Sequence, residues 1–243
     1  MGGELPGPAV ALIPAYEPTS ALCGLVNDLV DAGFEAVVVD DGSSLEAAEV
    51  FRAVGQMASV LHHETNRGKG QALKTGMEWI SDHCSDDTMV VTVDADGQHL
   101  LRDIVRVCTA GFTLTGAASL GLDSGLVLGV RIDDSTTPVR SRIGHDLSRA
   151  GLRMVTGRSL ADTQTGLRAF RVSMIPQMTA IPGSRFEYEM NQLFVLARRG
   201  VPFYQIRITT VYDDAGSHYR GLADSVRVGW NLVKCMWSSR RRR

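Results

Sequence analysis

The sequence lacks the cysteine spacing of a disulfide scaffold or a zinc site. Its four cysteines, Cys23, Cys84, Cys108 and Cys235, are scattered along the chain with no CxxC pair, as in a reduced cytosolic protein. No apolar run approaches the roughly 18 residues that span a bilayer. The first ten residues, MGGELPGPAV, have neither the basic start nor the apolar core of a signal peptide. We therefore expect a cytoplasmic chain whose association with a membrane would be peripheral.

Two nucleotide-binding fingerprints are also missing. No GxGxxG follows the first predicted strand, which argues against a Rossmann dehydrogenase. The basic, glycine-rich loop at residues 66–70 lacks the Gly-Lys-Ser/Thr ending of a Walker A loop. There is no internal repeat and no low-complexity linker, apart from a terminal run of arginines. Any nucleotide site must therefore be built in another way.

The composition is that of an ordinary globular protein, but the charge is uneven. The chain has 243 residues, 44% of them apolar and 21% charged, which suits one domain with a small appendage. Residues 220–243 hold seven Lys or Arg and one Asp, a net of +6, whereas the remainder holds 18 basic and 26 acidic side chains, a net of −8. A basic tail on an acidic body indicates an anionic partner, usually nucleic acid or a membrane surface.

Apolar runs and helical periodicity alternate along the first half of the chain. They predict strands at residues 9–13, 36–39, 60–61 and 90–93. Helices are predicted between 17 and 33, from the turn at 40–44 through Val54, at 71–80 and at 101–108. This alternation predicts an α/β fold with a mainly parallel sheet and helices on both faces. The second half is less regular, with strands predicted at 126–129, within 162–170, at 203–208 and at 210–212, and helices at 138–155, 185–199 and 222–237.

The strongest chemical signal follows the run Val90–Val93. Asp94 and Asp96 come directly after this predicted buried strand, and Gln98 and His99 come next. In an open α/β sheet, ligands bind at the carboxyl ends of the strands. Two carboxylates there repel each other unless a cation neutralises them, and Mg²⁺ or Mn²⁺ with substrate phosphates fits this spacing. The ordinary alternative is an acidic surface turn, and His99 could simply shape that turn.

Polar residues also end the first two predicted strands. In the segment Pro14-Ala15-Tyr16-Glu17, Tyr16 can stack on a base, or it can be a plain surface tyrosine after a proline-terminated strand. Val39 leads into Asp40-Asp41-Gly42-Ser43, where a carboxylate can accept a base N–H or cap a helix, and both uses can hold together.

Basic residues supply candidate anion sites. Lys69 lies between Gly68 and Gly70 just before a predicted helix, a setting that favours a diphosphate, although a flexible basic loop is as good an explanation. Arg131, Arg140 and Arg142 cluster beyond the fifth predicted strand, where their guanidinium forks suit an acceptor phosphate. The alternative is the solvated face of an arginine-rich helix.

One further turn, Asp162-Thr163-Gln164-Thr165-Gly166, could orient or deprotonate an acceptor through Asp162. Because a phosphate monoester is already largely ionised at neutral pH, with a second pKa of about 6, positioning matters more than proton abstraction for such an acceptor. Glu187 and Glu189 are rival carboxylates, with ordinary charges on a helix face as their alternative.

Taken in order, these motifs resemble those of the GT-A family 2 glycosyltransferases, and most of all the dolichyl- and polyprenyl-phosphate hexose synthases. The resemblance runs from about Ala9 to about Arg220. It implies a GT-A fold and a nucleotide-sugar site. The residues implied for that site are Pro14, Ala15, Tyr16, Glu17, Val39, Asp41, Lys69, Gly70, Asp94, Ala95 and Asp96.

The resemblance also implies roles within that site. Asp41 would contact the base and Asp40 would be structural. Asp94, Asp96 and Gln98 would hold the Mg²⁺ or Mn²⁺, and Asp162, Asp96 and Arg131 would serve catalysis. Arg131, Arg140 and Arg142 would bind the acceptor phosphate.

The function expected is metal-dependent, inverting transfer of a hexose from GDP-mannose or UDP-glucose to polyprenyl phosphate. Two alternatives stand beside it: the same fold acting on a hydroxyl of a glycan or small molecule, with Asp162 or Glu189 as a true base, and a non-catalytic nucleotide-sugar-binding protein. No nucleic-acid partner is expected, because the arginine tail has no reading element beside it. The oligomeric state is left open.

The expected domains are residues 1–218, a glycosyltransferase domain, and 219–243, a basic amphipathic helix with an arginine tail. Trp230 and Trp237 fall on one side of that helix, and basic residues lie nearby. This pattern suits a helix lying on an anionic membrane, and it suits equally a C-terminal helix packed on the domain.

Overall fold

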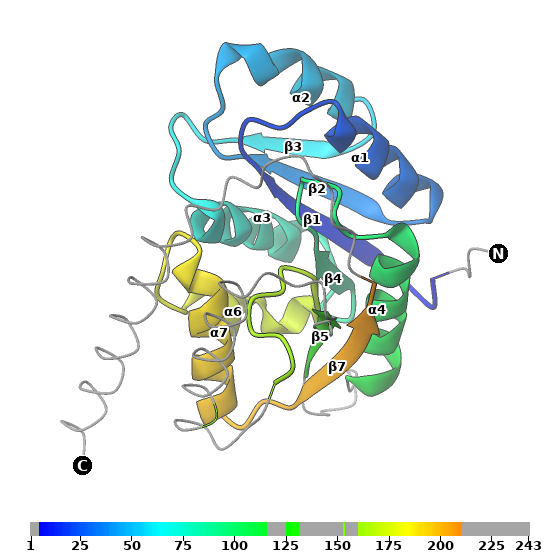
Figure 1. Ribbon diagram of the computed structural model, residues 1–243, viewed down its shortest axis with the longest axis vertical. Helices are drawn as coiled ribbons and strands as arrows, with labels where there is room; N and C mark the ends of the chain where they lie inside the picture. Colours follow the sequence, from blue (N-terminus) through cyan, green and yellow to red (C-terminus); the bar gives the residue numbers. More distant parts are fainter. Residues whose placement is uncertain (1–4, 116–124, 132–152, 154–159, 210–243) are drawn as a thin grey trace, which may run out of the picture.

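A single mixed β-sheet forms the centre of the molecule (Figure 1). The computed structural model describes residues 5–115, 125–131, 153 and 160–209, and seven strands lie within them. Their bounds are β1 Ala9–Ala15, β2 Glu35–Asp40, β3 Ser59–His62, β4 Met89–Thr92, β5 Leu126–Arg131, β6 Arg168–Arg171 and β7 Phe203–Ile208. The strand order is β3-β2-β1-β4-β6-β5-β7.

The sheet has a parallel part and a mixed part. Strands β3, β2, β1 and β4 run parallel to one another, and β5 is parallel to β7. Strand β6 is antiparallel to β4 on one side and to β5 on the other. The parallel strands are joined by helices, as right-handed crossovers require.

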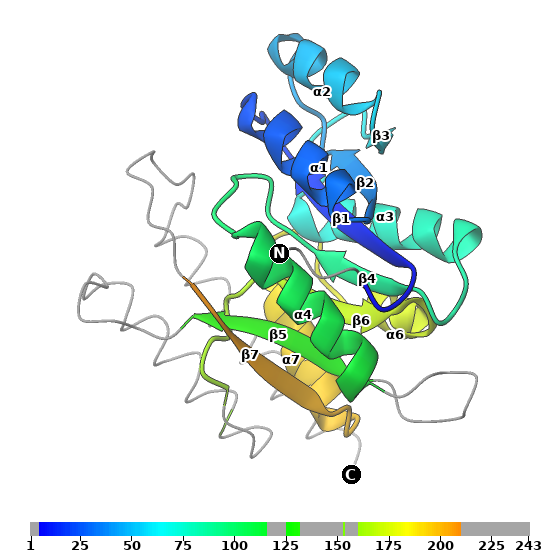
Figure 2. The ribbon, with the colours of Figure 1, turned by 90° about the vertical axis from the view of Figure 1, so that its right-hand side faces the viewer.

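Helices cover both faces of the sheet. Their bounds are α1 Ala21–Asp31, α2 Ala48–Val54, α3 Lys69–His83, α4 Leu101–Leu114, α6 Ile175–Thr179 and α7 Glu187–Arg198, with short 3-10 helices η1 at Leu45–Ala47 and η3 at Val172–Met174. Helices α1, α2 and α4 share one hydrophobic core with one face of the sheet, and α3, α6 and α7 share a second core with the other. Figure 2 shows α4 and α7 on opposite sides of β5.

The strand sequences explain this double coverage. Val10 and Leu12 belong to the core under α3, whereas Ala11 and Ile13 belong to the core under α1 and α4. Successive side chains of a strand point to opposite faces, so a strand buried on both faces must be apolar at every position. The uninterrupted apolar runs of β1, β2 and β4 meet this requirement.

The predicted fold class is confirmed, and several element boundaries differ from the prediction. Helix α3 begins at Lys69 rather than at residue 71, so Lys69 and Gly70 lie in its first turn. Helix α4 continues to Leu114 instead of ending at residue 108. The short helices η3 and α6 were not predicted. Glycine weakens a helical pattern, which hid the start of α3.

Several predictions fall on residues outside the described part of the chain. They are the helix at 138–155 with Arg140 and Arg142, the strand at 210–212, the helix at 222–237 and the boundary at 218/219. Within the described residues, none of the helices has both the length and the apolar character needed to cross a membrane.

Candidate active site

The candidate site lies beyond the carboxyl ends of β1, β2 and β4. Parallel pairing places Ala15 opposite Asp40, and Thr92 opposite Leu12, so the loops after these strands open at the same edge of the sheet. Ligands bind at this edge in open α/β sheets, because loops there diverge around a crevice. The sequence motifs at 14–17, 39–43 and 94–99 therefore occupy the expected edge.

An ion bridge links three distant elements at this edge. The Lys69 ammonium, in the first turn of α3, lies 2.7 Å from Oδ1 of Asp94 and 2.8 Å from Oε2 of Glu189. Asp94 follows β4, and Glu189 is in the first turn of α7. The Lys69 and Glu189 side chains are largely buried, and the Asp94 carboxylate is 29% exposed.

The ion bridge fixes the charge state of its members. Burial disfavours the charged form of Lys69, but the attraction of Asp94 and Glu189 outweighs it and raises the pKa of Lys69 above its ordinary range. Burial likewise opposes ionisation of Asp94, yet Lys69 and His99 hold its pKa well below the usual range. Asp94 is therefore a carboxylate and Lys69 an ammonium across the neutral range.

Two glycines bring Glu189 to Lys69. A Cβ added to Gly68 would lie 2.5 Å from the carbonyl oxygen of Ser184, and one added to Gly70 would lie 2.5 Å from Cβ of Tyr188. The backbone N–H of Gln71 also donates to the Ser184 carbonyl at 2.8 Å. Only residues without a Cβ allow this close approach, which docks the start of α7 on the start of α3.

A third glycine supports the Asp94 carboxylate. A Cβ at Gly166 would lie 2.5 Å from Oδ2 of Asp94. The Gly166 carbonyl accepts a hydrogen bond from the Thr92 hydroxyl at 2.6 Å, which fixes the 162–166 turn against the end of β4. The predicted turn thus lies directly behind the Asp94 carboxylate.

Asp162 and Arg131, both predicted as catalytic residues, contact each other. The Arg131 Nε donates to Oδ2 of Asp162 at 2.9 Å, and the Gln164 N–H donates to Oδ1 at 2.9 Å. Asp162 is buried, whereas the Arg131 side chain is 33% exposed at the end of β5. Asp162 thereby holds the orientation of Arg131, which extends toward solvent.

The predicted metal ligands Asp94, Asp96 and Gln98 differ in their surroundings. Asp96 is exposed, and its Oδ1 accepts the backbone N–H of Gln98 at 3.0 Å. His99 Nε2 lies 3.5 Å from Oδ2 of Asp94 and completes no hydrogen bond there. Across the described ranges, no three His, Cys, Asp or Glu side chains form a group that could hold a metal ion.

The chemistry of these groups fits a hard divalent cation in part. Two carboxylates and an amide oxygen are ligands that Mg²⁺ and Mn²⁺ prefer. Nε2 of His99 is buried 3.5 Å from Oδ2 of Asp94 and makes no hydrogen bond within the described residues. A cation held at Asp94 and Asp96 would therefore complete its coordination with oxygens from outside these side chains.

Arg168, in β6, lies behind the site. Its guanidinium is fully buried and donates to the carbonyls of Thr165 and Glu189 and to Oε1 of Gln192. Burial lowers the pKa of Arg168, an effect opposed first by Glu189. Arg168 thus links the 162–166 turn to α7 behind Asp94.

The aspartates after β2 are engaged by the protein itself. Asp41 is buried and accepts the backbone N–H groups of Arg67 and Gly68 at 2.9 and 2.7 Å, and it contacts Nδ1 of His63 at 2.7 Å. Its carboxylate therefore orders the 66–68 loop in front of Lys69. A contact between Asp41 and a base remains a prediction.

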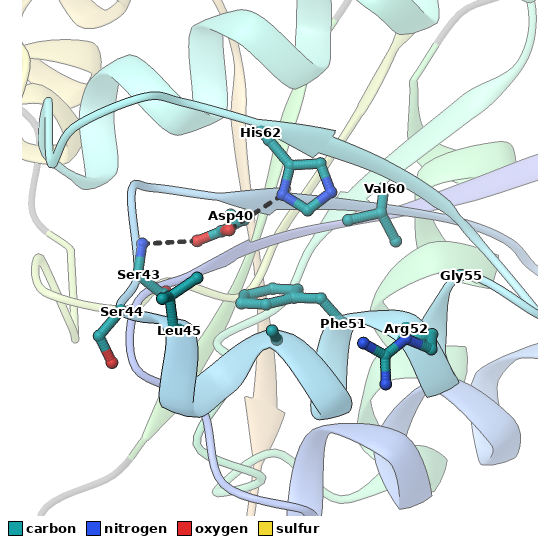
Figure 3. Close-up of a pocket in the computed structure, with 10 residues that line it drawn as sticks. Asp40, Ser43, Ser44, Leu45, Phe51, Arg52, Gly55, Val60 and His62 are labelled. Atoms are coloured by element: carbon teal, nitrogen blue, oxygen red, sulfur yellow. Dashed lines mark hydrogen bonds and ion pairs between the residues drawn. The ribbon is translucent and has the colours of Figure 1, made fainter.

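Asp40 faces a separate pocket between α2 and β3, shown in Figure 3. Its carboxylate accepts the Ser43 N–H at 2.9 Å and contacts Nδ1 of His62 at 3.0 Å, with the Phe51 ring beside them. These contacts agree with the structural role expected of Asp40.

The segment after β1 has one unusual conformation. Glu17 has a φ of 49°, which non-glycine residues rarely adopt. Its carboxylate accepts the Ser44 N–H at 2.8 Å and the Ser44 hydroxyl at 3.0 Å, which ties the loops after β1 and β2 together. Tyr16, just before it, is 54% exposed and can meet a ligand.

Sequence reasoning undervalued two residues of this site. Glu189 was weighed only as a rival base or an ordinary surface charge, yet its side chain is buried against Lys69. Arg168 was not singled out at all. A charge between apolar neighbours, as in Tyr188-Glu189-Met190 and Leu167-Arg168-Ala169, was the available signal.

Residues 10–107 match the model of the glycosyl transferase family 2. The chain is 25% identical over 228 residues to the UDP-N-acetylglucosamine–dolichyl-phosphate N-acetylglucosaminyltransferase of Methanococcus voltae, covering 84% of this chain and 85% of that one. It is 29% identical over 236 residues to an undecaprenyl-phosphate 4-deoxy-4-formamido-L-arabinose transferase of Edwardsiella ictaluri, covering 93% of this chain and 66% of that one.

Among solved structures, the fold is similar to that of glucosyl-3-phosphoglycerate synthase from Mycobacterium tuberculosis in complex with Mn²⁺, UDP and phosphoglyceric acid. The TM-score is 0.67 at 19% identity, covering 95% of this chain and 78% of that one. This likeness establishes the GT-A fold. The matched domain at residues 10–107 and these relatives make the chain similar to the glycosyl transferase family 2.

Proposed function

We propose that this glycosyltransferase moves a sugar from a nucleotide diphosphate sugar to a polyprenyl phosphate, with inversion at the anomeric carbon and with Mg²⁺ or Mn²⁺. The observation that carries the proposal is the meeting of Lys69, Asp94 and Glu189 beside the Asp162–Arg131 pair at one edge of the sheet. Two relatives are named for transfer to dolichyl or undecaprenyl phosphate, which supports a lipid phosphate as the acceptor.

The donor would lie along the loops after β1, β2 and β4. Tyr16 would stack on the base, and Lys69 would neutralise the diphosphate once the sugar nucleotide is bound. Asp94, Asp96 and Gln98 would hold a divalent cation, which when bound supplies Lewis-acid stabilisation of the leaving diphosphate. GDP-mannose and UDP-glucose are the donors we would test first.

The acceptor phosphate would meet Arg131, which Asp162 orients through the 2.9 Å contact to Nε. Arg140 and Arg142 are the further acceptor-binding residues we propose. A phosphate oxygen would attack the anomeric carbon from the face opposite the diphosphate. The new bond joins the sugar to the acceptor phosphate as the nucleoside diphosphate departs, and this inverts the configuration.

The proposal favours a phosphate over a hydroxyl acceptor for a geometric reason. Both oxygens of Asp162 are directed at protein donors, namely Arg131 and the Gln164 N–H. Glu189 is directed at Lys69. A hydroxyl acceptor needs a carboxylate within hydrogen-bond reach to take its proton, whereas a phosphate is already ionised.

Localisation follows from the acceptor. A polyprenyl phosphate lies in a membrane, so the enzyme would act at the membrane surface, on its cytoplasmic face. We propose that the basic segment 219–243 forms the second domain and provides peripheral attachment through its arginines and tryptophans.

A lipid-extraction assay tests the proposed function. The protein is incubated with Mg²⁺ or Mn²⁺, a short polyprenyl phosphate and radiolabelled UDP-glucose, UDP-N-acetylglucosamine or GDP-mannose, and label in the organic phase is counted. We expect one donor to label the lipid in a metal-dependent manner. Transfer of label to a glycan hydroxyl, with none in the lipid, would favour the hydroxyl alternative, and nucleotide binding without any transfer would favour the non-catalytic one.

A further inference from the structure

Lys69 is paired with Asp94, one of the proposed ligands of the divalent cation. Its ammonium lies 2.7 Å from Oδ1 of Asp94, the shorter of its two ion pairs. The other oxygen, Oδ2, lies 3.5 Å from Nε2 of His99, and both oxygens lie close to Gly166. A cation and the Lys69 ammonium therefore compete for the same carboxylate.

Glu189 gives Lys69 a second anionic partner that is built into the core. Its Oε2 lies 2.8 Å from the Lys69 ammonium, and its carbonyl accepts a hydrogen bond from the buried guanidinium of Arg168. The close packing at Gly68 and Gly70 fixes α7 against α3, so the distance between Lys69 and Glu189 is set by backbone contacts. Lys69 can thus leave Asp94 without losing every charge partner, which a buried ammonium could not tolerate.

We propose that Glu189 is a positioning residue that holds Lys69 while Asp94 passes to the divalent cation and Lys69 turns to the donor diphosphate. This inference rests on the proposed function. It gives Glu189 a role that differs from that of a general base and from that of a surface charge. Glu189 acts through Lys69 and contacts neither the sugar nor the acceptor. The ring of Phe186 also lies near the Lys69 ammonium, which is 5.9 Å from the ring centroid.

Substitution of Glu189 and substitution of Lys69 lead to opposite predictions for the binding of Mn²⁺ alone. In Glu189→Gln, Lys69 keeps only Asp94 as an anionic partner, so the competing ion pair strengthens and Mn²⁺ binds more weakly. In Lys69→Met, the competitor is gone and Mn²⁺ binds more tightly. We expect each change to be about tenfold, within the range usual for coupled sites.

The experiment measures Mn²⁺ affinity without nucleotide, from the electron paramagnetic resonance signal of free Mn²⁺ at neutral pH. The variants are Glu189→Gln, Lys69→Met and the double variant, with Asp94→Asn to identify the site. Glu49→Gln, an exposed carboxylate in α2, is the control for removing one negative charge. Circular dichroism and thermal unfolding confirm that each variant is folded.

The double variant separates an indirect from a direct role. If Glu189 acts through Lys69, Glu189→Gln has no further effect in the Lys69→Met background. Equal weakening in both backgrounds, or parent-like affinity in the single Glu189→Gln variant, would overturn the inference while leaving metal binding at Asp94 intact. If Asp94→Asn binds Mn²⁺ as tightly as the parent does, the metal part of the proposed function is overturned as well.

Discussion

Strands β2 and β4 lie on either side of β1, and each has two aspartates at its carboxyl end, Asp40 and Asp41 for β2 and Asp94 and Asp96 for β4. After β2, Asp41 is buried and is bonded to backbone N–H groups and to His63. After β4, Asp94 is partly exposed and is paired with a lysine side chain, and Asp96 is exposed. Similar carboxylates at the same edge of one sheet thus have different partners.

The kind of partner indicates whether a carboxylate has a structural role or is available for a reaction. Backbone donors are fixed in place, so a carboxylate that accepts them is committed to ordering a loop. A lysine side chain can be exchanged for another cation, so a carboxylate paired with it stays available. We therefore propose that Asp40 and Asp41 shape the site and that Asp94 and Asp96 take part in the reaction.

The largest effect is expected from Asp94→Asn. Loss of the negative charge removes both the cation site and the partner of Lys69, and we expect transfer to fall by about 10³-fold. The amide oxygen can still accept from Lys69, so thermal unfolding should change little. Lipid labelling per mole of folded protein measures this, and transfer within threefold of the parent would count against a reactive role for Asp94.

Asp41→Ala should instead show its effect in stability. Removing the carboxylate leaves the N–H groups of Arg67 and Gly68 and the ring of His63 without their acceptor. We expect a loss of about 3 kcal/mol in the free energy of unfolding. Urea denaturation measures it, and a loss below about 1 kcal/mol would contradict the loop-ordering role.

Gly166→Ala tests the support behind Asp94. Its Cβ would lie 2.5 Å from Oδ2 of Asp94, so the carboxylate must shift. We expect transfer to fall by roughly 100-fold, with a stability loss of about 1–3 kcal/mol from the displaced packing. The matched control is Gly24→Ala in α1, where an added Cβ meets no atom within 4 Å. Equal effects of the two substitutions would refute the account of Gly166.

The smallest effect is expected from Asp40→Asn. Asp40 keeps an oxygen for the Ser43 N–H, and its other partner, His62, has a side chain that is 58% exposed. The Asp40 side chain is largely buried, but an amide can still hydrogen-bond both the Ser43 N–H and His62, so we expect a loss of less than about 1 kcal/mol and unchanged transfer. A large loss of transfer would show that the pocket of Figure 3 takes part in the reaction.

Local sequence patterns predicted the parallel half of the fold. The apolar runs of β1, β2 and β4 and their polar endings are visible in short windows, which located Asp41 and Asp94 at one edge of the sheet. The antiparallel direction of β6 has no such signature, because strand direction depends on the connections between strands. The short helix α6 also lacks enough turns to show a period.

No short stretch of the sequence predicts the ion bridge between Lys69, Asp94 and Glu189. Lys69 and Glu189 are 120 positions apart, and their contact depends on the docking of α7 over Gly68 and Gly70. The same limit applied to Asp41, where the sequence allowed either a base contact or a cap. Its partners Gly68 and His63 are known only from the three-dimensional arrangement.

The most direct test of the account compares lipid labelling by the parent and by Asp96→Ala, at equal concentrations of folded protein. Asp96 is exposed and bonds only the Gln98 N–H among the contacts described, so its removal should leave the fold intact. The account predicts sugar label in the polyprenyl phosphate with the parent and about 100-fold less with Asp96→Ala. Equal labelling by the two proteins would contradict a cation-dependent reaction at the end of β4.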